Sequence, residues 1–331
     1  MTFKRFPFPN SRIQRVVFLI VWMVFIFVSS TYSQWMSRTS GSTDPFSAVT
    51  NAVEGRWYAV GARGLIVCSE DGGVTWSKQS SGTNNWLSSV SFVDENTGWI
   101  AGWNGTILST SNAGGSWLSH KGVISKSLYG VTFSDKRNGT VAGFEGTILR
   151  TKDGGVTWVE QSSGTTANLR DIFFSDSVTG VAVGSEGTIL RTTDAGETWT
   201  PQSSGKTTLL HKVRYVNTSF GTAVGEAGTI LITTNGGVDW QERSANTTSD
   251  LWDVYFTDEK TGFIVGSKGT LLKSTDGCTT WANQSAGTES DLRGVSFATA
   301  AIGVAVGVQG TILQTLNGGG CENFPFPQNL S

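Results

Sequence analysis

A repeat of 41 residues is the feature that most constrains the fold of this chain. Its clearest marker is a tryptophan that returns at this interval, at Trp35, Trp76, Trp117, Trp158, Trp199, Trp240 and Trp281. An Asp or Asn returns with the same spacing, at Asp71, Asn112, Asp153, Asp194, Asn235, Asp276 and Asn317. Periods of about 20–50 residues are typical of solenoids, propellers and other repeat arrays.

Each repeat contains four short segments with strand character. In one copy these are residues 169–174, 180–184, 187–192 and 198–205, which are rich in β-branched and aromatic residues and separated by polar turns. No segment has the 3.6-residue apolar stripe of a helix. Four antiparallel strands in about 40 residues describe a propeller blade. The sequence therefore predicts an all-β fold, a seven-bladed β-propeller.

The two ends of the repeat array predict how the ring closes. In the seventh copy Glu322 occupies the tryptophan position, whereas Trp35 lies one repeat before Trp76. Residues 35–42 also resemble residues 76–83. We therefore expect the N-terminal strand to complete the last blade, which removes exposed sheet edges.

The recurring turn reads [Ser/Thr]-x-[Asp/Asn]-x-Gly-x-x-Trp, the pattern of an Asp-box. Its Asp or Asn is expected to accept hydrogen bonds from backbone N–H groups about two residues further on, while its Gly permits a positive φ. The Trp buries a large area and can donate its indole N–H. The alternative, calcium binding, is disfavoured because three of the seven residues are Asn and the turns point away from one another. We therefore predict a structural role for this turn.

The first 33 residues are predicted to be a signal peptide. Lys4, Arg5, Arg12 and Arg15 precede an apolar run at residues 16–28, and Thr31 and Ser33 are small residues suited to cleavage before Gln34. The alternative is an uncleaved anchor, although thirteen apolar residues are short for a membrane span. The predicted organisation is a signal peptide at 1–33, a propeller at 34–321 and a short tail at 322–331. We expect an exported protein, retaining no membrane span after cleavage.

Charge and metal-ligand content exclude several function classes. Removing the four basic residues of the leader from the 24 in the chain leaves 20 basic against 26 acidic residues. A mildly acidic protein lacks the charge footprint of a nucleic-acid binder. Only two His and three Cys are present, with no Cys-x-x-Cys pair, so we expect no metal site and no cofactor. Cys68, Cys278 and Cys321 are predicted to be free, partly buried thiols.

Variable positions within the repeat identify a candidate binding face at the mouth of the central channel. The second residue of each innermost strand is Ser47, Ser88, Tyr129, Arg170, His211, Trp252 or Arg293, and the third is Ala48, Ser89, Gly130, Asp171, Lys212, Asp253 or Gly294. The turn after the second strand adds Trp103 and Phe144 as exposed aromatics. Arg, Tyr and Trp often anchor protein interfaces. The alternatives are solvated positions without a ligand, or a small anion held by Arg170 and Arg293.

The complete repeat resembles the photosystem II stability and assembly factor propellers. Residues 128–158 and 169–199 carry the resemblance best, with the pattern L-x-x-[Val/Ile]-x-F…G-T-I-L-x-T-x-D-G-G-x-T-W, and it extends over residues 35–321. The resemblance implies a non-enzymatic assembly scaffold that binds a protein or peptide, here as an exported bacterial relative. We expect a monomer.

Asp-boxes also occur in sialidases and some glycanases, so a glycan-active or glycan-binding protein is the alternative. Sialidases place an arginine cluster, a Tyr and a Glu on irregular loops, for which a uniform 41-residue spacing leaves no room. We therefore predict no catalytic residues. A structural envelope protein without a specific partner is the third option.

Overall fold

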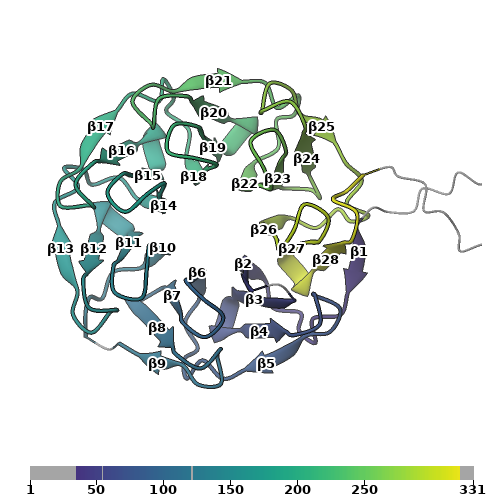
Figure 1. Ribbon diagram of the computed structural model, residues 1–331, viewed down its shortest axis with the longest axis horizontal. Helices are drawn as coiled ribbons and strands as arrows, with labels where there is room; N and C mark the ends of the chain where they lie inside the picture. The colour runs from purple at the N-terminus through teal and green to yellow at the C-terminus, as the bar shows by residue number, and fades with distance from the viewer. Residues whose placement is uncertain (1–34, 54, 121, 321–331) are drawn as a thin grey trace, which may run out of the picture. The chain divides into compact units, whose positions relative to one another are not determined.

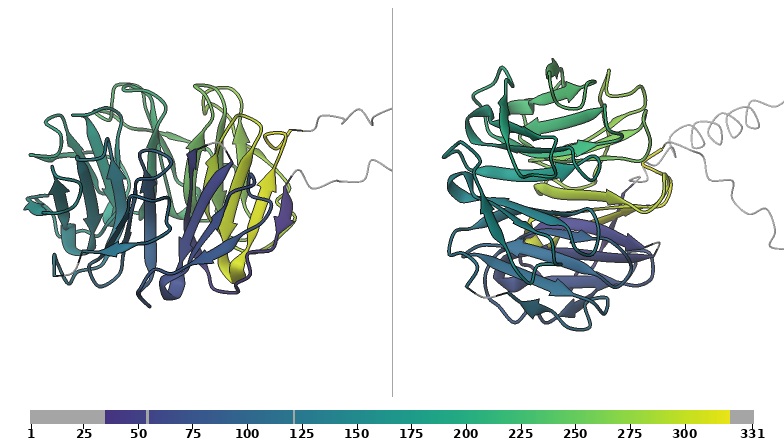
Figure 2. Two further views of the ribbon diagram at one scale, coloured as in Figure 1. Left: turned by 60° about the horizontal axis from the view of Figure 1, so that its bottom comes forward. Right: turned by 60° about the vertical axis from the view of Figure 1, so that its left-hand side comes forward.

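The computed structural model describes residues 35–320 except 54 and 121, and these residues form a seven-bladed β-propeller (Figure 1). Each blade is one four-stranded antiparallel sheet, as the repeat predicts. In the side views of Figure 2 the strands run roughly along the ring axis, so each blade presents its turns on two opposite faces. Among the described residues, no helix has the length and apolar character needed to cross a membrane.

The strands of each blade follow one another outward from the axis. The innermost strands are β2 (Phe46–Val53), β6 (Leu87–Phe92), β10 (Leu128–Phe133), β14 (Leu169–Phe174), β18 (Leu210–Tyr215), β22 (Leu251–Phe256) and β26 (Leu292–Phe297). The second strands are β3 (Arg56–Gly61), β7 (Gly98–Gly102), β11 (Gly139–Gly143), β15 (Gly180–Gly184), β19 (Gly221–Gly225), β23 (Gly262–Gly266) and β27 (Gly303–Gly307).

The third strands are β4 (Ile66–Ser69), β8 (Thr106–Thr110), β12 (Ile148–Thr151), β16 (Ile189–Thr192), β20 (Ile230–Thr233), β24 (Leu271–Ser274) and β28 (Ile312–Thr315). The outer strands are β5 (Ser77–Gln79), β9 (Leu118–Ser119), β13 (Val159–Gln161), β17 (Thr200–Gln202), β21 (Gln241–Arg243), β25 (Ala282–Asn283) and β1 (Met36–Arg38). Single 3₁₀ turns link the second and third strands at η1 (Ala62–Gly64), η2 (Phe144–Gly146), η3 (Ser185–Gly187), η4 (Glu226–Gly228) and η5 (Val308–Gly310).

Burial explains why the second strand is the most uniform part of the repeat. Every residue of β7, β11, β15, β19, β23 and β27 is buried, because both faces of this strand pack against neighbouring blades. The glycine that ends the strand is required by a close backbone approach. A Cβ on Gly184 would lie 2.0 Å from the carbonyl oxygen of Asn168. The recurring glycine therefore lets the start of the inner strand pack against the turn.

The N-terminal strand completes the seventh blade, which confirms the predicted closure. β1 pairs antiparallel with β28, with Met36 opposite Gln314 and Arg38 opposite Ile312. The Arg38 side chain donates to Gln314 Oε1 at 2.6 and 2.9 Å. Trp35 is buried with Phe263 and Phe297, so the strand is anchored in the core between the sixth and seventh blades. Both chain ends of the propeller are thus held in one sheet.

The recurring Asp/Asn turn connects the third strand to the outer strand. In the fourth blade Asp194 accepts hydrogen bonds from the Thr198 backbone N–H at 2.9 Å and the Thr198 hydroxyl at 2.6 Å. Thr192 Oγ1 donates to the same carboxylate at 2.7 Å and accepts the Gly196 N–H at 2.9 Å. The backbone N–H that the carboxylate accepts thus belongs to the fourth residue after the Asp, not to about the second as expected. The turn is therefore two residues longer than a simple Asx turn.

The Asn residues serve the same geometry. Asn112 Oδ1 accepts the Ser116 N–H at 3.0 Å, and Asn235 Oδ1 accepts the Asp239 N–H at 3.0 Å. The tryptophan that follows varies in its bonding: Trp76 and Trp240 donate their indole N–H to a carbonyl within the turn, at 3.0 and 3.2 Å. Trp199 and Trp281 are buried without such a bond. Packing is therefore the contribution common to these rings.

The thiols follow the sequence expectation within the described residues. Cys68 and Cys278 are free and buried, and burial raises the pKa of each, to about 11 and about 12. Neither is therefore a reactive thiolate near neutral pH. Cys321, the predicted signal peptide and the predicted tail lie outside the described residues.

Candidate functional site

All seven innermost strands carry a β-bulge at their second residue. In β14, Leu169 pairs with Gly184 and Asp171 with Val183, so Arg170 has no partner in the ladder. The same break in register occurs at Ser47, Ser88, Tyr129, His211, Trp252 and Arg293. A bulge re-aims a side chain and is often found beside functional sites. The predicted binding residues are therefore the residues that the sheet leaves unpaired.

Five of these bulge residues, from the third to the seventh blade, form contacts with their neighbours. We call Tyr129, Arg170, His211, Trp252 and Arg293 the axial cluster. The Arg170 guanidinium lies 4.8 Å from the centroid of the Tyr129 ring, and the Arg293 guanidinium lies 5.0 Å from that of Trp252. The His211 and Trp252 rings are 4.0 Å apart. The structure thus brings the predicted residues together as two cation–π pairs with a histidine between them.

The electrostatics of the axial cluster are those of a site for negative charge. Neither Arg170 nor Arg293 makes an ion pair with any described residue. Burial lowers the pKa of Arg293; the negative charge of Asp291 opposes this shift, and the positive charge of Arg170 adds to it. Burial also lowers the pKa of His211 to about 4, again helped by Arg170. The two arginines therefore add positive charge to the same region without forming an ion pair, although Asp291 lies near Arg293 and Asp250 near His211.

His211 is the most buried member of the axial cluster. Its side chain is only 7% exposed, and its Nε2 has no hydrogen-bond partner. Trp252, which stacks on it, donates its own indole N–H to Ser267 Oγ at 3.0 Å. Stacking beneath Trp252 explains the burial. His211 thus supports the cluster and offers one unsatisfied nitrogen.

The third residues of the innermost strands do not form a binding surface. Except for the half-buried Lys212 they are buried, and several join one blade to the next. Ser89 Oγ, Asp171 Oδ2 and Asp253 Oδ2 accept the backbone N–H of Val131, Val213 and Val295 at 3.3, 3.1 and 3.0 Å. These residues vary because neighbouring blades pack together in different ways. In the sequence alone, such variation looks the same as variation caused by ligand binding.

Asp171, next to Arg170 in the sequence, also forms two ion pairs within the fold. Its carboxylate receives Lys212 Nζ at 3.2 Å and an Arg214 guanidinium nitrogen at 3.0 Å. With both carboxylate oxygens engaged and 1% of the residue exposed, it is a structural acceptor. A buried carboxylate with two cationic partners is stable only while the partners remain. The negative charge of Asp171 is therefore balanced by Lys212 and Arg214 within the fold.

Trp103 and Phe144 are exposed, by 46% and 39%, as the sequence predicted. Trp103 stacks on Trp86, with ring centroids 5.5 Å apart and an interplanar angle of 20°. Sequence reasoning missed Trp86, which lies immediately before β6. The signal was available, because the corresponding residue of the next repeat is the small Ser127.

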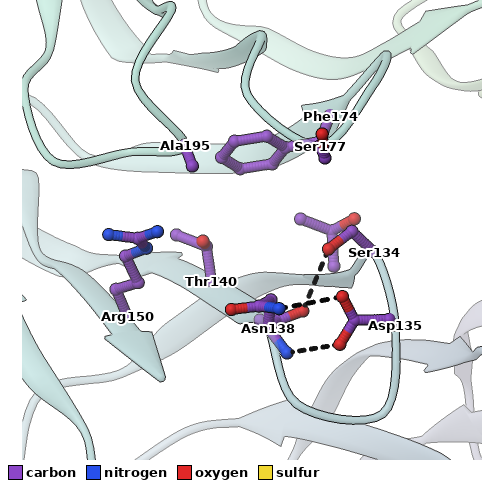
Figure 3. A pocket seen from close by; sticks show the side chains of 10 residues that line it. Ser134, Asp135, Asn138, Thr140, Arg150, Phe174, Ser177 and Ala195 are labelled. Atoms are coloured by element: carbon purple, nitrogen blue, oxygen red, sulfur yellow. Dashed lines mark hydrogen bonds between the residues drawn. The ribbon is translucent and has the colours of Figure 1, made fainter. Parts of the chain in front are cut away.

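A small cleft between the third and fourth blades has no features of a binding site (Figure 3). It encloses about 130 Å³, and its polar groups bond to one another. Asp135 accepts the Asn138 backbone N–H and side-chain amide, at 2.9 and 2.8 Å. Arg150, on the same side of the cleft as Asp135, pairs with Glu197 at 3.0 Å. This cleft is a seam between blades.

Comparison with known proteins places the chain in a family. The family model described as "Photosynthesis system II assembly factor YCF48" matches residues 29–122, 160–244 and 239–323. No curated protein sequence matches significantly. Among solved structures, "YCF48 bound to D1 peptide" is similar with a TM-score of 0.74 and 22% identity, over 87% of this chain and 96% of that one.

Two further structures show the breadth of the fold. YCF48 from Cyanidioschyzon merolae has a TM-score of 0.72 and 18% identity, over 85% of this chain and 98% of that one. The GH74 xyloglucanase from Xanthomonas campestris has a TM-score of 0.70 and 13% identity, over 89% of this chain and 55% of that one. The similarity to an enzyme at this identity concerns the fold. The family match covers most of the repeats, and the chain therefore belongs to the photosynthesis system II assembly factor YCF48 family.

Proposed function

We propose that this protein is a non-enzymatic assembly factor that binds a segment of a partner protein at the axial cluster. The observation that carries the proposal is the pair of arginines, which lie over the rings of Tyr129 and Trp252 and form no ion pair with a described residue. Elsewhere in the described part of the chain basic side chains do pair with acids, as Arg150, Lys206 and Arg214 do. The unpaired arginines are therefore available to a ligand.

The arrangement favours an extended peptide with acidic and apolar side chains. The two arginines lie on β14 and β26, three blades apart, so one ligand that meets both must extend across the start of several innermost strands. An extended chain can place one carboxylate at each guanidinium and an apolar side chain against the rings between them. A solved YCF48 is bound to a D1 peptide, which supports a peptide partner for this relative.

Glycoside cleavage is the less favoured alternative at this position. Such chemistry generally requires a pair of carboxyl groups beside the scissile bond. The carboxylates beneath the axial cluster, Asp171 and Asp253, are buried and bonded to neighbouring blades. Burial raises the pKa of Asp253, yet its position below the bulge residues keeps it from a ligand. A binding function needs neither group.

The test is crosslinking of the full chain in its native host, followed by identification of the captured protein and binding of synthetic peptides from the crosslinked region. We expect capture by the natural protein and loss with an Arg170→Ala/Arg293→Ala variant. An Arg63→Ala variant, which removes an exposed arginine of the first blade, serves as the matched control. Equal capture by all three proteins would contradict the proposal.

We also propose that the protein acts after export. The proposal rests on the basic and apolar pattern of residues 1–33. Sequencing the N-terminus of the protein from its host should give Gln34 as the first residue. An intact N-terminus would favour the uncleaved anchor instead.

A further inference from the structure

A second aromatic feature, separate from the axial cluster, lies at the edge between the first and second blades. It consists of the stacked rings of Trp86 and Trp103. Trp86 donates its indole N–H to Ser47 Oγ of the first blade, and its carbonyl accepts the Trp103 backbone N–H at 2.8 Å. The hydroxyl of Thr106 also donates to the Trp103 carbonyl, at 2.7 Å. The two rings therefore form a fixed apolar plate, of which the outer ring is 46% exposed.

The fold does not require this plate. At the position of Trp86 the other repeats hold Pro45, Ser127, Asn168, Leu209, Asp250 and Asp291. At the position of Trp103 they hold Ala62, Phe144, Ser185, Glu226, Ser267 and Val308. The fourth blade closes the same turn without aromatic rings: the Ser185 N–H donates to the Asn168 carbonyl at 2.9 Å, and the Asn168 N–H donates to the Ser185 hydroxyl at 2.9 Å. Two tryptophans in one blade are thus an addition to the repeat.

The plate forms one wall of an open cleft of about 450 Å³. The remaining lining residues are mostly polar: Asp44, Pro45, Ala62, Arg63, Asn84, Asn85 and Asn104. The Asn85 side chain donates a hydrogen bond to Thr106 Oγ1 at 2.9 Å and accepts one from the Asn104 side-chain amide at 3.2 Å. Asn84 makes no described side-chain bond and is exposed, and Asp44 and Arg63 are joined by a loose 3.5 Å ion pair. Donors and acceptors are therefore both available beside an apolar surface.

These features match the chemistry of a neutral sugar. A pyranose ring has an apolar C–H face that packs on an indole, and its hydroxyl groups both donate and accept hydrogen bonds. Amide, carboxylate and guanidinium groups together meet both requirements. An acidic ligand would meet Asp44, and a nucleic acid would find one guanidinium that is already paired. We propose that this cleft binds a neutral oligosaccharide, with Trp103 as its stacking platform.

A proline-rich peptide is the competing ligand, because such segments dock in aromatic grooves. The indole N–H of Trp86, which would serve a peptide carbonyl, is already bonded to Ser47. This observation favours the sugar. Decaproline therefore serves as a probe that distinguishes the two ligands.

The test is titration calorimetry of the full chain with cellohexaose, maltohexaose and chitohexaose, and with decaproline as the peptide probe. We expect binding of at least one neutral hexasaccharide, weakened at least about tenfold by Trp103→Ala, because truncating a central aromatic anchor removes the main contact surface of the ligand. Phe144→Ala removes the exposed aromatic at the same position of the third blade and should leave the affinity unchanged. Arg170→Ala/Arg293→Ala should also leave it unchanged, which separates this site from the axial cluster.

Three results would overturn the proposal. The first is the absence of binding to all three hexasaccharides at millimolar concentration. The second is binding that Trp103→Ala and Asn104→Ala leave unaltered. The third is binding of decaproline in preference to every sugar, which would assign the cleft to a peptide.

Discussion

The two ends of each blade differ in how much their residues vary. Where the third strand turns into the outer strand, the same Ser or Thr and Asp or Asn recur from blade to blade, and the Gly recurs in all but the sixth blade, which has Cys278 in its place. Where the innermost strand begins, the bulge residue changes from Ser to Tyr, Arg, His and Trp. The polar groups of the Asp/Asn turn form hydrogen bonds with one another. At the start of the innermost strand, Arg170 and Arg293 lie over aromatic rings and form no ion pair with a described residue. Constancy thus marks the part that builds the ring, and variation marks the part where we propose that a ligand binds.

The largest effect is expected from removing a buried ring at the constant end. Trp199 is 8% exposed and meets Phe174 edge-to-face at 6.1 Å. Trp199→Ala should lower the free energy of unfolding by about 3–5 kcal/mol, because it leaves a large cavity. The exposed Trp103→Ala should cost less than about 1 kcal/mol. Urea unfolding of both variants measures the difference, and equal losses would remove the distinction between the two ends.

His211 should make the variable end sensitive to mild acid. Its pKa is about 4 in the folded protein, against 6.5 in the unfolded chain, so the unfolded state binds a proton first. Stability should therefore fall as the pH drops from 6.5 toward 4, by roughly 3 kcal/mol at most, since one pKa unit corresponds to about 1.4 kcal/mol.

His211→Phe keeps an aromatic ring beside Trp252 and removes the titration. Unfolding measured at several pH values should show a shallower acid dependence for this variant than for the natural protein. His120, whose pKa burial also lowers, contributes equally to both proteins and cancels in the difference. Identical pH dependence would show that His211 is not buried as described.

The smallest effect is expected at a single Asp/Asn turn. Hydrogen bonds from Thr198 lower the pKa of Asp194 from 3.8 to about 2, so the contribution of the carboxylate is present above pH 3.8 and lost toward pH 2. Asp194→Ala removes these bonds and should cost roughly 1 kcal/mol, the usual net value of a lost hydrogen bond. Asp194→Asn should cost only a few tenths, because the amide replaces the acceptor, as at Asn112. Melting temperatures of the pair test this order, and a larger loss with Asn would contradict it.

The repeat was sufficient to predict the blades, their strand order and the closure by residues 36–38, because each depends on a pattern that recurs at fixed spacing. The bulge at Arg170 was not predictable, since a strand with one extra residue has no distinct sequence pattern. The burial of Asp171 and the stacking of His211 on Trp252 depend on contacts between blades. Sequence therefore located the variable positions, and only the structure separates those that are free from those that join blades.

The most direct test of the account compares the two ends in one experiment. The affinity for the crosslinked partner peptide and the melting temperature are measured for the natural protein, for Arg170→Ala/Arg293→Ala and for Trp199→Ala. We predict that the arginine variant loses at least about tenfold in affinity with little change in melting temperature, while the Trp199 variant loses melting temperature and, while folded, keeps its affinity. Unchanged affinity in a folded arginine variant would contradict the assignment of the axial cluster as the binding site.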